Sequence, residues 1–214
     1  MKCVEAIREI VGASVPYYSE SRANPGLYER VLRSLKPSCS PLTMTEDGTD
    51  ATLTKVYLTG LKNGSLVLKP DHFGINYYKS GTWNRECDYL ILTKYSDADY
   101  AIFVELKSSL QDNPSEHDKR LVLRSKEDRR KAEQIESSCV LFDFLCFVAK
   151  KKYGTLECDN FEKKKVVLYE SVKPRSPMQS NMRGTTNELE KSPDVFTLQL
   201  HNLATIDIKR LVEL

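Results

Sequence analysis

The sequence predicts an α/β fold, and three features of its 214 residues support that class. Short apolar runs on both sides of a polar turn, between residues 88 and 106, are typical of paired strands. Two more apolar runs flank Asn63-Gly64, a dipeptide typical of hairpin turns. Apolar residues at helical spacing, in residues 2–13 and 131–151, predict helices. With 40% hydrophobic residues, the chain can bury the core of a single domain.

Composition and charge exclude some protein classes and leave the partner open. The net charge of +2 is too small to identify a nucleic-acid binder, so a binding surface would have to come from local clusters of Lys and Arg. Charged residues within the first apolar stretch exclude a signal peptide, and no apolar run reaches membrane-spanning length. We therefore expect a soluble, cytoplasmic protein without a membrane partner.

The cysteines are expected to be reduced, mostly buried thiols of an intracellular protein. They form no C-x-x-C pair and no Cys/His spacing of a zinc site, and several lie inside apolar runs. The six residues are Cys3, Cys39, Cys87, Cys139, Cys146 and Cys158.

Two helices are predicted ahead of the sheet. The first covers residues 2–13 and is amphipathic. The second begins at Asn24-Pro25, an N-cap followed by a first-turn proline, and ends at Pro37. Residues 38–50 are rich in Pro, Ser, Thr and Asp, which predicts a loop.

The sheet is predicted to begin with strands in residues 53–61 and 65–69, on either side of the hairpin dipeptide. Residues 71–83 interleave aromatic side chains with polar and basic ones, a mixture that suits stacking on a nucleic acid. Packing of these aromatic residues beneath a loop at the sheet edge fits the pattern at least as well.

Residues 88–92 and 100–106 are predicted to form the central hairpin, with residues 93–99 as its turn. Lys107 lies on the same face as Glu105, because side-chain direction alternates along a strand. The pairs expected across the hairpin are Asp88 with Glu105, Leu90 with Phe103, and Leu92 with Ala101. Like charges placed opposite each other destabilise a sheet, so the two acids require a cation, either Lys107 or a metal.

A long helix is predicted after the hairpin. Residues 108–123 are charged and contain Pro114, which indicates a surface loop or a short helix. A capping box at Ser125 then starts a helix that continues through residues 131–151. The apolar content of this helix is nearly continuous, so we expect burial on most of its circumference.

Polar and basic residues at the start of this helix are candidates for substrate contact. Lys131 and Ser138 share a helical face with Gln134 and could reach a substrate, although a Gln facing solvent is equally consistent with the pattern. The cations at this end could line a phosphate track, or form an ordinary solvated helix start. The candidates for phosphate contact are Arg124, Arg129, Arg130 and Lys131.

Strands and loops are predicted to alternate in the remainder of the chain. Residues 165–169 form a strand, residues 174–193 a long mobile loop low in apolar residues, and residues 195–200 another strand. Residues 206–214 close the chain as a short strand or helix.

Asp88 on one strand, followed by the Glu105-x-Lys107 triplet on the next, resembles the hairpin of the PD-(D/E)xK nuclease superfamily. Gln134-Ile135 in the following helix also matches that family, whereas Cys87 stands where the family pattern has proline. The resemblance covers residues 25–170. It implies a restriction-endonuclease-like core, with a central mixed β-sheet flanked by helices, in one nuclease-like domain of residues 1–214 with a C-terminal extension at 195–214.

By this resemblance, Asp88 and Glu105 would bind Mg²⁺ or Mn²⁺ together with the backbone carbonyl of Leu106. Lys107 would orient or activate the attacking water, and the amide of Gln134 would approach the metal or that water.

The family also places an acidic residue on a helix ahead of the sheet. Glu29 is the expected residue in this chain, with Glu9 or Glu5 as alternatives.

The implied function is metal-dependent hydrolysis of phosphodiester bonds, with DNA favoured over RNA and with a homodimer as one arrangement of the enzyme. One alternative is a non-catalytic nucleic-acid-binding or protein-interaction module of the same fold. The other is a salt-bridged strand end, with Glu105 paired to Lys107 or Lys79, in an unrelated α/β interaction protein.

Overall fold

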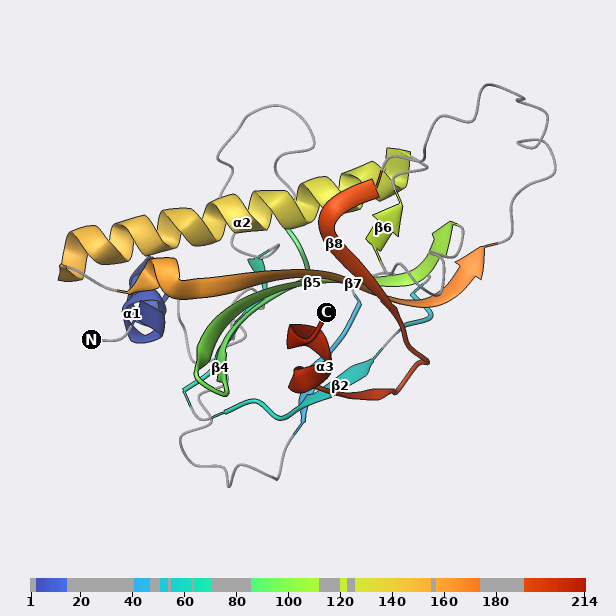
Figure 1. Ribbon diagram of the computed structural model, residues 1–214, viewed down its shortest axis with the longest axis horizontal. Coiled ribbons are helices and arrows are strands. Elements are labelled where there is room, and N and C mark those ends of the chain that lie inside the picture. Colours follow the sequence, from blue (N-terminus) through green and yellow to red (C-terminus); the bar gives the residue numbers. More distant parts are fainter. Residues whose placement is uncertain are drawn as a thin grey trace.

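The structure is a computed structural model, and it describes ten segments of the chain. These are residues 3–14, 41–46, 51–53, 55–62, 64–70, 86–111, 120–122, 126–154, 157–173 and 191–214. They form an α/β architecture with two mixed sheets and flanking helices, which confirms the predicted class (Figure 1).

The described elements follow one another in this order: α1 (Cys3–Ser14), β1 (Leu42–Met44), β2 (Val56–Thr59), β3 (Leu66–Leu68), β4 (Tyr89–Tyr95), β5 (Ala98–Gln111), β6 (Arg120–Val122), α2 (Lys126–Tyr153), η3 (Cys158–Asn160), β7 (Phe161–Lys173), β8 (Lys191–Gln199), β9 (Thr205–Asp207) and α3 (Ile208–Val212).

A six-stranded sheet with the order β3-β4-β5-β7-β8-β6 forms the middle of the molecule. β4 is antiparallel to β3 and β5, whereas β7 is parallel to both β5 and β8. Parallel neighbours need a long crossover, and the segment that contains α2 provides it between β5 and β7. β1, β2 and β9 form a separate three-stranded sheet.

The central sheet is buried on both faces because its strands carry apolar side chains in both directions. On β5, Ala101 and Phe103 point into a core shared with α1 and α2. Ile102 and Val104 point into a second core, shared with the three-stranded sheet and α3. The molecule therefore has three layers, with the six-stranded sheet between the two cores (Figure 1).

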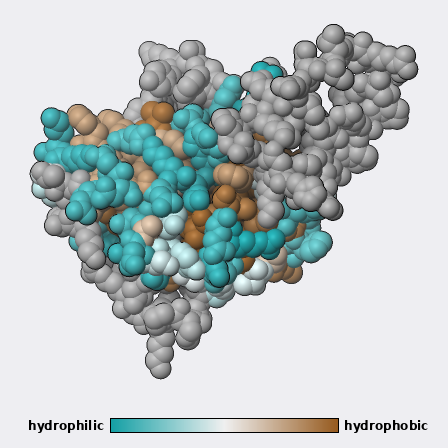
Figure 2. Space-filling view, in the orientation of Figure 1, coloured by the Kyte–Doolittle hydropathy of each residue, from teal (hydrophilic) through white to brown (hydrophobic). Residues whose placement is uncertain are grey.

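α2 confirms the predicted long helix but is buried on one face only. Ile135, Cys139 and Phe142 belong to the core, whereas Val140 and Phe147 remain 52% and 56% exposed. The expected burial on most of the circumference is wrong because α2 forms an outer layer of the molecule. Figure 2 shows hydrophobic atoms among hydrophilic ones on the upper side of the molecule, where α2 lies.

The prediction that the strands on either side of Asn63-Gly64 pair as a hairpin is also wrong. Ser65 N donates to Lys62 O at 3.1 Å across a turn in which Gly64 has a φ of +86°. The two strands beside this turn nevertheless enter different sheets. β3 is buried at all three positions and joins the central sheet, whereas β2 alternates between buried and half-buried residues and joins the outer sheet.

Several strands extend into segments predicted as loops. β4 and β5 pair up to Tyr95 and Ala98, so the predicted turn 93–99 shrinks to Ser96-Asp97. The polar side chains of this segment lie at the solvent-exposed end of the hairpin, and they do not prevent backbone hydrogen bonding between β4 and β5.

The region predicted as a surface loop or short helix at 108–123 also contains strand. β5 continues to Gln111 because its polar end still pairs with β7, and β6 follows at Arg120–Val122. β1 lies in the predicted loop 38–50, and β8 begins at Lys191.

Three predictions lie outside the described residues: the helix from Asn24, the aromatic segment 71–83, and most of the loop 174–193. Residues 195–214, expected as an extension, contribute β9 and most of β8, and α3 adds Leu211 to the second core. Among the described helices, none has the length and apolar character needed to cross a lipid bilayer.

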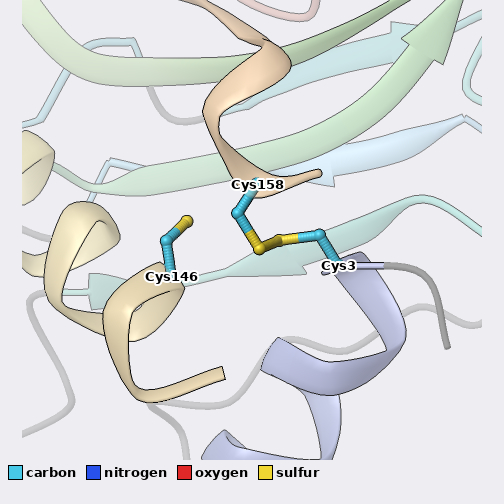
Figure 3. A group of neighbouring side chains, drawn as sticks. All are labelled: Cys3, Cys146 and Cys158. Carbon is cyan, nitrogen blue, oxygen red and sulfur yellow. A yellow bond between two sulfur atoms is a disulfide. The ribbon is translucent and has the colours of Figure 1, made fainter. Parts of the chain in front are cut away.

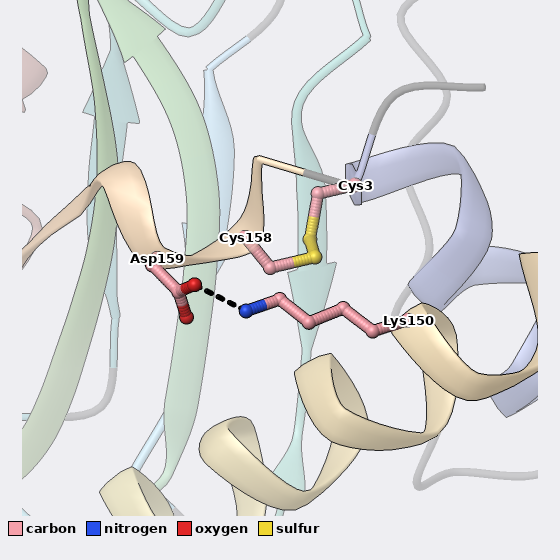
Figure 4. Close-up of a disulfide and its surroundings, with 4 residues drawn as sticks. All are labelled: Cys3, Lys150, Cys158 and Asp159. Carbon is pink, nitrogen blue, oxygen red and sulfur yellow. Dashed lines mark hydrogen bonds and ion pairs between the residues drawn. A yellow bond between two sulfur atoms is a disulfide. The ribbon is translucent and has the colours of Figure 1, made fainter. Parts of the chain in front are cut away.

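The expectation that all cysteines are reduced is wrong for two of them. Cys3 at the start of α1 and Cys158 of η3 form a disulfide, because the fold places these segments next to each other (Figure 4). Cys87, Cys139 and Cys146 are free and buried, as expected, and Cys39 lies outside the described residues.

Gly60 provides a test of how the outer sheet meets α3. Gly60 and Gly64 both have positive φ, so alanine strains either backbone by about 1 kcal/mol. A Cβ on Gly60 would also approach Asp207 Oδ2 to 2.7 Å, whereas nothing lies within 4 Å of a Cβ on Gly64. Gly60→Ala should therefore lower the free energy of unfolding in urea by more than Gly64→Ala. Equal losses would contradict the close packing at Asp207.

Candidate active site

The central hairpin has the predicted register. Leu90 pairs with Phe103 and Leu92 with Ala101. Asp88 lies one residue before β4, and Leu106 N donates to Asp88 Oδ2 at 2.6 Å. Asp88 N in turn donates to Glu105 Oε2 at 3.3 Å. The two carboxylates predicted to face each other are therefore neighbours at the end of this hairpin.

Lys107 completes this cluster through an ion pair. Its Nζ lies 2.8 Å from Glu105 Oε1, and the side chains of Lys107 and Glu105 are 25% and 0% exposed. Burial alone lowers the pKa of Lys107, but attraction to Glu105, Asp88 and Glu46 outweighs burial and holds that pKa above its ordinary value. Lys107 is therefore an ammonium at neutral pH, and it offsets part of the negative charge around it.

The cluster lies on the face of the sheet that α2 covers. Phe103, two residues before Glu105 and on the same face, packs edge-on against Phe142 of α2 with ring centroids 6.1 Å apart. Gln134 Nε2 donates to Glu86 O at 3.4 Å, so its amide lies beside the chain that leads to Asp88. The structure thus places Gln134 beside the segment that leads into the hairpin end.

Ser138 has a structural role at this junction. It is fully buried, and its hydroxyl accepts a hydrogen bond from Cys87 N at 2.8 Å and donates one to Gln134 O at 3.1 Å. These bonds attach the start of β4 to α2. The suggestion that Ser138 reaches a substrate is therefore wrong, because its side chain is buried and its hydroxyl is hydrogen-bonded within the protein.

Cys87, the residue directly before Asp88, is not suited to nucleophilic chemistry. Burial raises the pKa of its thiol well above the ordinary value, and the neighbouring Ser138 hydroxyl only partly offsets this. Its Sγ donates to Tyr89 O at 3.2 Å. The protonated, buried thiol leaves the two carboxylates and Lys107 as the charged groups of this cluster.

Sequence reasoning missed two residues next to the cluster. Ser108 Oγ donates to Glu46 Oε2 at 2.7 Å and accepts from Thr52 N at 2.6 Å, which ties the chain after β1 to the end of β5. Glu46 is close enough to raise the pKa of Lys107. A third carboxylate therefore joins Asp88 and Glu105, from a segment predicted to be a loop, and no local pattern marks it.

The acidic residues proposed on a helix ahead of the sheet are not brought to this cluster. Glu29 lies outside the described residues. Glu9 of α1 accepts a hydrogen bond from Tyr153 Oη at 2.6 Å, and Glu5 is exposed on the same helix. Tyr153 is about 28 Å along α2 from Gln134, so α1 occupies the opposite end of that helix.

The basic residues at the start of α2 differ in their exposure. Arg129 is exposed and Arg130 is half-buried, whereas Lys131 is only 2% exposed. Arg124 lies outside the described residues. Lys131 therefore does not present its ammonium on the surface as a phosphate track requires.

Comparisons with protein families, with curated proteins and with solved structures found no match for this chain.

Lys107→Met tests the electrostatics of the cluster. Removing the ammonium leaves Glu105 buried beside Asp88 and should lower the free energy of unfolding at pH 8 by about 1–3 kcal/mol. The pKa of Lys107 is higher in the folded chain than in the unfolded chain. Its stabilising contribution is therefore complete below about pH 10.5 and disappears as the pH rises through the folded pKa.

Lys209→Met is the matched control, because Lys209 pairs with Glu213 at 3.7 Å while both side chains are about 60% exposed. This change should cost less than about 0.5 kcal/mol. Urea denaturation of both variants at pH 8 and near pH 11 measures the difference. Equal losses at pH 8, or a Lys107→Met loss that grows with pH, would contradict the assignment.

Proposed function

We propose that this protein is a metal-dependent nuclease of the PD-(D/E)xK type, which hydrolyses phosphodiester bonds with Asp88, Glu105 and Lys107. The observation that carries the proposal is the pair of hydrogen bonds that hold Asp88 against Glu105 and Leu106 while Lys107 contacts Glu105. The two acids and the lysine lie at the end of the β4–β5 pair, whose register brings Asp88 alongside Glu105.

The donor set suits a hard divalent cation. Asp88 and Glu105 supply neighbouring carboxylates, the ligand type that Mg²⁺ and Mn²⁺ prefer. In a strand, the N–H and C=O of one residue point to the same side. Because Leu106 N donates to Asp88, the Leu106 carbonyl also points to that side, just beyond the end of β4. Asp88, Glu105 and the Leu106 carbonyl would therefore hold the ion.

The negative charge of the site also favours a cation. Asp88 and Glu105 carry two negative charges beside one Lys107 ammonium. Glu46 adds a third negative charge, which also attracts that ammonium. Glu105 is fully buried, so uncompensated charge there is costly. A bound divalent cation would supply a Lewis acid for the phosphoryl oxygen.

The protein groups have separate tasks in this proposal. The ammonium of Lys107 would donate hydrogen bonds to the attacking water or to a phosphate oxygen, and would offset the charge that develops there. The raised pKa of Lys107 argues against its serving as the base at neutral pH. Gln134 of α2 would orient the attacking water. Its amide contacts Glu86 O, two residues before Asp88.

The substrate in this proposal is DNA in preference to RNA. Arg129 and Arg130 lie at the end of α2 that is nearest to Gln134 and could contact phosphates on either side of the cleaved bond. The buried Lys131 would act within the protein instead.

A nuclease assay with plasmid and single-stranded DNA in Mg²⁺ or Mn²⁺ tests the proposal. Glu105→Gln and Lys107→Met should each lower the cleavage rate at least about 100-fold, because each removes charge that acts on the reacting phosphate. Glu213→Gln and Lys209→Met make the same chemical changes in a surface ion pair and should cleave at the wild-type rate.

Two outcomes would contradict the proposal in different ways. Equal cleavage by all four variants would remove the assigned site. DNA binding by the wild type without metal and without cleavage would instead favour a non-catalytic binding module of the same architecture.

A further inference from the structure

Three cysteine sulfurs meet at the end of the molecule remote from the candidate active site. Cys3 begins α1, Cys146 lies in α2 and Cys158 lies in η3, and their sulfur atoms are all within 4.8 Å of one another. The three residues are 3–6% exposed. Figure 3 shows their side chains converging from these three segments.

Two oxidation states of this cluster differ in what they can bind. In the structure Cys3 and Cys158 form a disulfide, and Cys146 is a free thiol beside it (Figure 3). A dithiol reductant would transfer two electrons and two protons to the disulfide, and would itself become a disulfide. The protein would then hold three thiols in one buried cluster.

The size of the reduced cluster suits a zinc ion. Zn–S bonds are about 2.3 Å long, so tetrahedral coordination places neighbouring sulfurs about 3.8 Å apart. Cys146 Sγ lies within 4.8 Å of the other two sulfurs and would approach them by at most about 1 Å. The Cys3 and Cys158 sulfurs, about 2.05 Å apart in a disulfide, would separate by about 1.7 Å after reduction. Three thiolates from separate segments would hold the ion and leave the fourth coordination position open.

A cavity next to the sulfurs offers a position for the fourth ligand. It has a volume of about 380 Å³, and Cys146, Cys158, Asp159, Lys150 and Lys163 are among the residues that line it. Asp159 is 82% exposed and pairs with Lys150 at the cavity (Figure 4). Water from this cavity could therefore complete the coordination, while the Asp159 carboxylate pairs with Lys150.

Three thiolates with one Zn²⁺ carry a net charge of −1. The cavity beside them is balanced in charge, because Lys150 pairs with Asp159 and Lys163 pairs with Asp143. Burial raises the pKa of Cys146 to about 12, so without a metal its thiol stays protonated, and forming the thiolate ligand costs part of the binding free energy. A thiophilic cation would displace that proton.

We propose that the reduced protein binds one Zn²⁺ through Cys3, Cys146 and Cys158. Binding forms three Zn–S bonds and releases three thiol protons to solvent. The ion joins α1 and η3 to α2 in place of the disulfide, so the same end of the fold is held together under oxidising and under reducing conditions. Cys146 lies about 18 Å along α2 from Gln134, and the proposal does not rest on nuclease activity.

Zinc titration of the full-length protein tests this site. The protein is reduced, freed of reductant and titrated with Zn²⁺ against a chromophoric chelator. Wild type should bind one equivalent, and Cys146→Ser should bind at least tenfold more weakly. Cys139→Ser is the matched control, because Cys139 is a buried free thiol two helical turns earlier on α2 and should leave affinity unchanged.

Two further measurements keep the test independent of any effect of substitution on folding. The oxidised wild type should bind zinc at least tenfold more weakly than the reduced wild type. Co²⁺ bound to the reduced wild type should show thiolate charge-transfer absorption, which Cys146→Ser reduces. Equal zinc affinity in both oxidation states, no zinc bound by the reduced protein, or equal losses in Cys139→Ser and Cys146→Ser would overturn the proposal.

Discussion

The antiparallel pairing of β4 with β5 is the constraint on which the candidate site depends. Side chains alternate along a strand, so a slip of one residue would turn Asp88 away from Glu105 and exchange the two apolar faces. The register is fixed because both faces are buried: Phe103 must meet α2 while Ile102 and Val104 meet the opposite core. The packing that stabilises the sheet therefore also holds the carboxylates together.

The three layers give this strand end its chemical character. α2 covers one face, fixes the start of β4 through Ser138 and brings Gln134 alongside. The segment after β1 approaches through Ser108 and adds Glu46. Glu105 is thus enclosed and ion-paired with Lys107, which keeps partial access to solvent. The proposed metal-dependent hydrolysis rests on this arrangement of a buried acid, a half-buried acid and a partly exposed cation.

Local pattern was sufficient to predict the hairpin register and α2, because each depends on periodicity within one or two adjacent segments. The expectation that Gln134 approaches the hairpin came from the family resemblance instead. Local pattern failed where long-range packing decides. The turn at Gly64 resembles a hairpin, but the burial of β3 on both faces takes that strand into the other sheet. Glu46 reaches Ser108 across 62 residues, and Cys3 reaches Cys158 across 155, so no spacing rule would reveal either contact.

The most direct test of the central claim is the anomalous difference map of a crystal grown with Mn²⁺. The proposal predicts a peak between Asp88 and Glu105 at coordination distance from both carboxylates, about 2.1 Å, and its loss in Glu105→Gln. Wild-type crystals with no peak there, and with Lys107 still paired to Glu105, would show that these residues form only a salt-bridged strand end.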